Sequence, residues 1–177
     1  TLLWKQRVQE GVFEVSRLQS EGAKLKVLFA VREDLESWPG GDTVQIQKTA
    51  SALKAMDVRV TFCSDPSADL SSHDCVHLWH LERVHETYIH LVNAKKYGKP
   101  VVLSPIYWPR GNIPRGALPS LAFRLRGFLE DVKNAYRYLR AHSLVSRKAA
   151  LLAWKQGWVR CRREILDSAR ILLPNSR

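Results

Sequence analysis

The stretch Lys26-Val-Leu-Phe-Ala-Val31 decides the fold, together with GGDTVQIQKTASALKAM, residues 40–56. The first segment is apolar without alternation, which is typical of a parallel strand covered on both faces. In the second segment Ile46, Ala50 and Leu53 recur at helical spacing and predict one buried helix face. The two segments therefore predict a central strand, a loop and an amphipathic helix.

The loop between them ends in Pro39-Gly40-Gly41. Asp42 is placed to cap the helix, with Gln45 three positions later as in a capping box. A helix N-terminus offers unpaired amides and a positive dipole, and glycine lets a ligand approach the backbone, so Gly40 and Gly41 are candidates for binding a diphosphate. The pair lacks the spaced glycines of a dinucleotide fingerprint and the lysine of a P-loop, and an ordinary turn is the alternative.

The rest of the chain alternates predicted strands with predicted helices. A helix at 86–97 should bury Ile89 and Val92, with Leu91 as a further candidate. Further strands are predicted at 58–63, 74–80, 99–104 and 169–174. This order specifies βαβ units and an α/β fold, a Rossmann-like parallel sheet with helices on both faces. Residues 1–24 are predicted to form a packing helix and residues 25–177 the Rossmann-like domain.

Ligands of such sheets bind beyond the carboxyl ends of the strands. His80 stands at one of these ends and is a candidate for catalysis, the alternative being a hydrogen-bonded rim residue. His77 and His80 should point to opposite faces of one strand, so we expect no metal site. The polar residues delivered to this edge are Arg32, Asp65, His80, Glu82, Arg83, Ser104 and Tyr107.

The positive charge of the chain is unevenly distributed along the sequence. The net charge is +11, yet residues 1–109 carry 13 Lys and Arg against 13 Asp and Glu, while residues 110–165 carry 13 against 3. The excess therefore marks one local surface.

The cysteines, at 63, 75 and 161, form no CxxC pair and fit buried thiols in a reducing compartment. No apolar run is long enough to span a membrane, and no leader opens the chain.

Residues 110–167 predict long basic amphipathic helices. One apolar stripe runs from Leu121 to Leu139, and Ala150, Trp154 and Trp158 form another. Cations interleaved with aromatic residues are attracted to anionic membrane surfaces. The alternatives are packing helices with a solvated basic face, or binding of nucleic-acid phosphates, which no recognition module supports. The predicted membrane-contacting residues are Arg124, Arg126, Lys133, Arg137, Arg140, Arg147, Lys148, Trp154 and Trp158.

Three segments carry a family resemblance. They are GGDTVQIQKTASALKAMDVRVTFC (40–63), DCVHLWHLERVHETYIHLVNAKKYGKPVVLSPIYW (74–108) and ARILLPNSR (169–177). Their order and spacing resemble the N-terminal half of retaining, two-domain (GT-B type) glycosyltransferases of family four, the glycosyl transferase group 1 like enzymes, especially bacterial enzymes of surface-polysaccharide assembly.

The resemblance implies two facing domains that bind different substrates. A C-terminal domain holds the nucleotide-diphosphate sugar, which is a co-substrate rather than a cofactor, and no metal is needed. The glycine loop, Gly40 and Gly41, lies against the donor diphosphate. The N-terminal domain binds a sugar or lipid-linked acceptor through His80, Glu82, Arg83, Ser104 and Tyr107, and its basic helices dock on the cytoplasmic leaflet. This chain has Ser104 where many relatives have a histidine, and His80 where an asparagine is common.

We therefore expect the acceptor-binding half of a cytoplasmic glycosyltransferase, peripheral on the inner membrane. Its donor-binding domain should lie outside this chain, so the chain alone should be inactive. Exposed apolar stripes could also drive formation of a homodimer. The competing hypothesis is a non-catalytic basic module that binds anionic lipid or nucleic acid.

Overall fold

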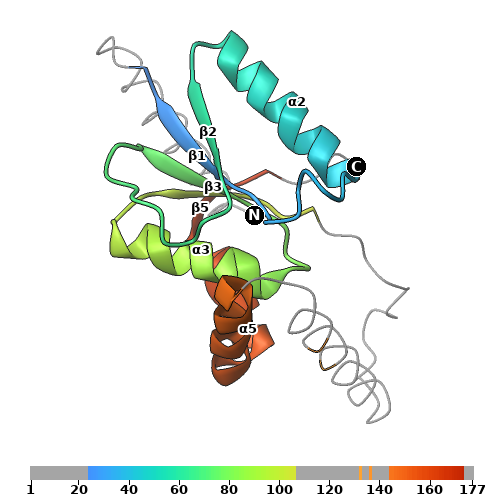
Figure 1. Ribbon diagram of the computed structural model, residues 1–177. Helices are drawn as coiled ribbons and strands as arrows, with labels where there is room; N and C mark the ends of the chain where they lie inside the picture. Colours follow the sequence, from blue (N-terminus) through green and yellow to red (C-terminus); the bar gives the residue numbers. More distant parts are fainter. Residues whose placement is uncertain (1–23, 107–131, 133–135, 137–143, 174–177) are drawn as a thin grey trace, which may run out of the picture.

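The computed structural model describes residues 24–106, 132, 136 and 144–173. These residues form a five-stranded parallel sheet with helices on both faces, as the alternation of segments predicted (Figure 1). Within these ranges every helix is too short or too polar to cross a membrane. The elements are β1 (Lys26–Ala30), α2 (Gly41–Ala55), β2 (Arg59–Cys63), β3 (Cys75–Trp79), α3 (Val84–Lys96), β4 (Val101–Ser104), α5 (Leu144–Gln156), α6 (Trp158–Ser168) and β5 (Ala169–Leu172).

The strand order is β2-β1-β3-β4-β5. Phe29 of β1 stands opposite Phe62 of β2 on one side and opposite His77 of β3 on the other. The chain thus leaves β1 toward one edge of the sheet, returns, and continues from β3 toward the other edge. In open parallel sheets ligands bind beyond the carboxyl ends of the strands at such a reversal. Here this switch point lies between β1 and β3.

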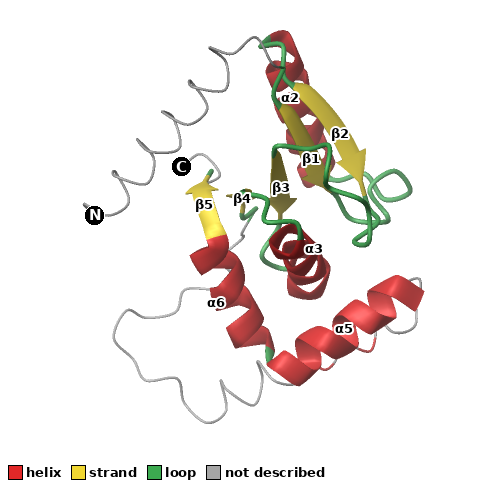
Figure 2. Ribbon diagram, turned by 90° about the vertical axis from the view of Figure 1, so that its left-hand side faces the viewer, coloured by secondary structure: helices red, strands yellow, loops and turns green. Residues whose placement is uncertain are grey.

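Successive residues of β1 enter two separate hydrophobic cores. Phe29 packs on the α2 side in a cluster that includes Ile46, and Leu28 packs on the other side in a cluster that includes Leu78 and Leu91. Figure 2 shows α2 on one side of the sheet and α3, α5 and α6 on the other. Burial on both faces explains the unbroken apolar run, because an alternating strand would expose polar residues to one core.

The start of α2 differs from the predicted cap. Gly40 is the N-cap residue, and Asp42 lies inside the first turn. The hydroxyl Oγ1 of Thr43 accepts the Gly40 N–H at 3.1 Å, the role expected of Gln45. The predicted Asp42–Gln45 box is therefore wrong, because the helix cap lies two residues earlier, and the physical reason is that the Asp42 carboxylate is held by Arg32 instead.

Helix α3 is buried more widely than its predicted stripe. Val92 was expected inside but is 39% exposed, whereas Leu91 is fully buried. The helix also begins earlier, at Val84, and buries polar residues such as His85 and Glu86. The reason is a second layer: α5 and α6 pack on α3 from the side away from the sheet (Figure 2). A helix between two layers loses the single buried face that periodicity predicts.

The predicted stripe of Ala150, Trp154 and Trp158 does not form one face. Ala150 is buried with Ala149 and Ala153, whereas Trp154 is 63% exposed. Trp158 belongs to α6 and packs against the core beside His85. Small residues let α5 approach α3 closely, which leaves the large indole of Trp154 outside. The packing helix at residues 1–23 and the stripe from Leu121 to Leu139 lie outside the described residues, apart from Val132 and Tyr136.

Candidate functional site

Six polar side chains meet at the switch point of the sheet. Two guanidiniums face three carboxylates and one imidazole there. Arg32 and Asp34 follow β1, Asp42 lies in the first turn of α2, His80 and Arg83 follow β3, and Glu86 lies in the first turn of α3. We call this set the switch-point cluster: Arg32, Asp34, Asp42, His80, Arg83 and Glu86.

Arg32 is the centre of the cluster and is only 7% exposed. Its guanidinium donates to Asp42 Oδ2 at 2.7 Å and to Asp34 Oδ1 at 2.7 Å. It also donates to the carbonyl of Trp38 and, at 3.3 Å, to Thr43 Oγ1. Burial works to lower the pKa of Arg32, but the two carboxylates outweigh it and raise that pKa. Arg32 therefore ties the β1–α2 loop to the start of α2 as a permanent cation.

Arg83 links the same loop to α3. Its guanidinium donates to both carboxylate oxygens of Asp34, at 2.8 and 2.9 Å, and to Glu86 Oε1 at 3.2 Å. Burial alone would raise the pKa of Asp34, but the hydrogen bonds and charges of Arg83 and Arg32 hold it well below its usual range. The pKa of Glu86 is also lowered, through His85 and Arg83, against the effect of burial. The carboxylates therefore stay ionised at neutral pH.

His80 has an unusual backbone at the end of β3. Its φ of 70° is in the left-handed region, which a non-glycine residue seldom adopts and which costs about 1–3 kcal/mol. Two contacts hold this conformation: the His80 N–H donates to the Ser104 carbonyl at 3.0 Å, and Thr87 Oγ1 donates to the His80 carbonyl at 3.0 Å. The conformation directs the imidazole to α2, where Nε2 lies 3.3 Å from Asp42 Oδ2.

His80 is neutral at pH 7 because burial lowers its pKa, and the nearby Asp42 only partly reverses that effect. For Asp42, burial acts to raise the pKa, but Arg32 and His80 lower it overall. The Nε2 atom of His80 is buried and makes no hydrogen bond of good geometry with any described residue. A neutral imidazole beside a carboxylate can exchange a hydrogen bond or a proton with a hydroxyl group.

The two glycines differ in what surrounds them. A Cβ on Gly40 would lie 2.7 Å from Asp42 Oδ1, whereas a Cβ on Gly41 would meet nothing within 4 Å. The Gly40 N–H is already bound by Thr43. Of the predicted diphosphate-binding pair, only Gly41 therefore presents open backbone.

The other predicted acceptor residues take separate positions. Ser104 is buried, and its Oγ lies 2.9 Å from Nε2 of His77, whose pKa burial lowers to about 3. Glu82 is exposed. Tyr107 lies outside the described residues, as do the predicted membrane contacts Arg124, Arg126, Lys133, Arg137 and Arg140. The sequence pattern predicted Arg32, His80 and Arg83 at the carboxyl edge of the sheet but did not predict Asp34 and Glu86 there.

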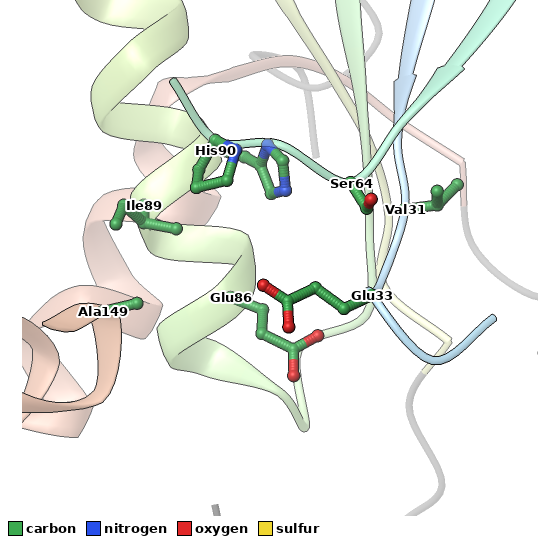
Figure 3. A pocket seen from close by; sticks show the side chains of 8 residues that line it. Val31, Glu33, Ser64, Glu86, Ile89, His90 and Ala149 are labelled. Carbon is green, nitrogen blue, oxygen red and sulfur yellow. The ribbon is translucent and has the colours of Figure 1, made fainter. Parts of the chain in front are cut away.

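A small pocket lies beside the cluster on the α3 side. The carboxylates of Glu33 and Glu86 face the same space below His90, and Ala149 of α5 closes one side (Figure 3). The space left inside is enough for about one water molecule. Within the described part of the chain, no group of three or more His, Cys, Asp or Glu side chains could hold a metal ion.

His90 makes stability sensitive to mild acid. Burial lowers the pKa of His90 to about 4 from an ordinary 6.5. Between those values the unfolded chain binds a proton that the folded chain does not, so stability is complete above pH 6.5 and falls as the pH approaches 4. We expect a loss of about 2–3 kcal/mol from this residue.

Urea unfolding at several pH values checks this expectation. His90→Gln should reduce the pH dependence between pH 6.5 and 4, and His73→Gln, at a partly exposed position, is the control. An unchanged slope in the His90 variant would show that other groups carry the effect.

Comparisons of the chain with protein-family models, with curated proteins and with solved structures gave no significant match.

Proposed function

We propose that this chain is the acceptor-binding half of a glycosyltransferase that uses a nucleotide-diphosphate sugar. The observation that supports this function best is the switch-point cluster, at the edge where parallel sheets bind ligands. It offers guanidinium donors and carboxylate acceptors within hydrogen-bonding distance of each other, which suits the many hydroxyl groups of a sugar. Fold alone does not identify an activity, so the proposal rests on these side chains and on the family resemblance.

In this proposal the acceptor sugar lies against His80 and Arg83. Neutral His80 can accept a hydrogen bond from an acceptor hydroxyl, while Asp42 stabilises the imidazolium if the proton is transferred. The donor sugar and its leaving group are supplied by a second domain outside this chain. Transfer assays on the whole enzyme test the function, and Arg83→Gln should raise the acceptor KM with little effect on the donor KM. No change in either KM would remove the cluster from acceptor binding.

The open backbone at Gly41 is the proposed contact for the donor diphosphate. Amide groups in the first turn of α2 favour an anion, although Asp42 already complements part of this positive end. Because a Cβ at Gly41 meets no protein atom within 4 Å, a larger side chain should leave the fold intact and intrude only on a ligand.

Gly41→Val in the whole enzyme should therefore weaken donor binding by about tenfold or more, equivalent to about 1.4 kcal/mol. Calorimetric titration with the nucleotide sugar measures this effect. Ser51→Val, at the exposed face of α2, is the matched control for a β-branched substitution in the same helix. Equal donor affinity in the two variants would exclude Gly41 from the donor site.

Helix α5 is the described part of the proposed membrane surface. Its outer side exposes Leu151 and Trp154 beside the cations Arg147, Lys148 and Lys155. Each cation near an anionic surface adds about 1 kcal/mol to binding, and an interfacial tryptophan adds apolar burial. These features support a location at the cytoplasmic face of the inner membrane.

Sedimentation with vesicles tests the membrane proposal on this chain. The bound fraction should rise with the content of anionic lipid and should fall several-fold in the double variant Lys148→Gln, Trp154→Ala. Lys54→Gln, at the far end of α2, is the control for loss of one positive charge. Binding that is independent of lipid charge would favour an ordinary solvated face. Binding of vesicles without sugar transfer by the whole enzyme would favour the non-catalytic module. Light scattering tests separately whether the chain forms a homodimer.

A further inference from the structure

Two guanidiniums from different elements converge on one carboxylate. Asp34 Oδ1 accepts from Arg32 Nη1 at 2.7 Å and from Arg83 Nη1 at 2.8 Å, and Asp34 Oδ2 accepts from Arg83 Nη2 at 2.9 Å. Paired guanidinium donors of this kind recognise carboxylate and phosphate groups in two-pronged fashion. The occupant here is a side chain of the protein itself.

Both arginines have independent anchors. Arg32 is also held by Asp42, Thr43 and the carbonyl of Trp38. Arg83 is also held by Glu86 at 3.2 Å. If the Asp34 carboxylate moved away, both guanidiniums would stay where they are, still facing the same point.

Asp34 differs from Asp42 and Glu86 because it lies on a loop and they lie in the first turns of helices. It lies in the loop after β1, and its side chain is 18% exposed. Among the described residues its carboxylate hydrogen-bonds only to Arg32 and Arg83, while its backbone carbonyl accepts from the Trp38 N–H, from Ser37 Oγ and from Arg32 Nη1. Arg83 is itself 24% exposed at the side chain, so a ligand can reach Arg83 from solvent, whereas Arg32, at 5%, is reached only through the position that Asp34 occupies.

We propose that Arg32 and Arg83 bind a phosphate group of the acceptor, and that Asp34 occupies this position until the ligand displaces it. The charges are compatible with exchange: without Asp34, two guanidiniums face the two carboxylates of Asp42 and Glu86. A phosphate group bound in place of Asp34 restores the present balance as a monoanion and adds one further negative charge as a dianion. The assignment to an acceptor rests on the proposed function, whereas phosphate binding itself depends only on the geometry of the two arginines.

Inorganic phosphate is the first probe, titrated into this chain at constant ionic strength. The side-chain Nε–H signals of Arg32 and Arg83 report binding by NMR. Asp34→Asn should bind phosphate about tenfold tighter than the unmodified chain, because the internal competitor is neutral. Asp57→Asn is the matched control, since it also removes one negative charge but from the exposed pair with Lys24. Adding Arg83→Gln to Asp34→Asn should abolish binding.

Equal phosphate affinity in the Asp34 and Asp57 variants would overturn the proposal. If Asp34→Asn does not fold, the unmodified chain decides: no shift of either arginine signal at saturating phosphate would overturn it too. A second arm compares glucose 1-phosphate and vesicles containing phosphatidic acid, which separates a soluble phosphate ester from a lipid headgroup. Phosphate binding without sugar transfer by the whole enzyme would refute the proposed function but support this phosphate site. Sugar transfer without phosphate binding would support the proposed function and refute the phosphate site.

Discussion

Replacing Arg32 with methionine should lower the free energy of unfolding by about 3–5 kcal/mol, because it leaves the buried ends of two carboxylates without their common cation. Asp34 keeps Arg83 as a partner, but among the described residues Asp42 keeps no cation and is left with the neutral His80 and the Thr43 backbone N–H. The Trp38 carbonyl also loses a donor. Urea unfolding followed by circular dichroism measures the change, provided that the slope with denaturant is the same in both proteins.

Lys24→Met is the control for this experiment. The pair that Lys24 forms with Asp57 is just as short, at 2.6 Å, but both side chains are largely exposed. Its loss should cost no more than about 1 kcal/mol. If the two methionine variants were equally stable, the network around Arg32 would not contribute to holding the edge of the sheet together.

Phe29→Ala should be similarly destabilising, by about 3–5 kcal/mol, because it opens a cavity in the middle of the sheet. Phe29 is fully buried, and its ring contacts His77 and Trp79 edge to face at 4.9 and 5.1 Å between centroids. Those two residues belong to β3, and His80 directly follows this strand. The substitution should therefore loosen the candidate site as well as the core.

Phe62→Ala removes the same ring from the neighbouring strand, where the side chain is 41% exposed. The two rings touch edge to face at 5.7 Å, so each substitution removes this contact. Only the Phe29 change leaves a closed cavity, and the expected cost at Phe62 is about 1 kcal/mol. Equal losses would show that the contact between the rings, and not the cavity, carries the effect.

Several residues of the candidate site could be placed from sequence because strand ends are local features. Arg32, His80 and Arg83 follow apolar runs directly, and the carboxyl ends of parallel strands share one edge. Asp34 and Glu86 could not be found in this way. Their importance depends on Arg83, which is 49 residues from Asp34 along the chain. A charged residue can pair with any opposite charge that the fold brings near, so its own sequence neighbourhood carries no record of its partner.

The same limit applies to the pairing of His77 with Ser104. The two residues are 27 positions apart, and they meet because β3 and β4 are neighbours in the sheet. The sequence pattern placed Ser104 at the end of its strand and His77 in the middle of another strand. It assigned Ser104 to an acceptor and made no connection to His77.

The amino-acid sequence by itself determined the five strands, the helices α2 and α3, and the burial of β1 on both faces. These features follow from local periodicity, because the face on which a side chain lies is set by its position in the repeat of the strand or helix. Only the tertiary structure decided the strand order, the second helix layer over α3, the first residue of α2 and the ion pairs of the switch-point cluster. Those choices depend on contacts between distant segments, whose energies are comparable for many pairings until the whole chain is packed.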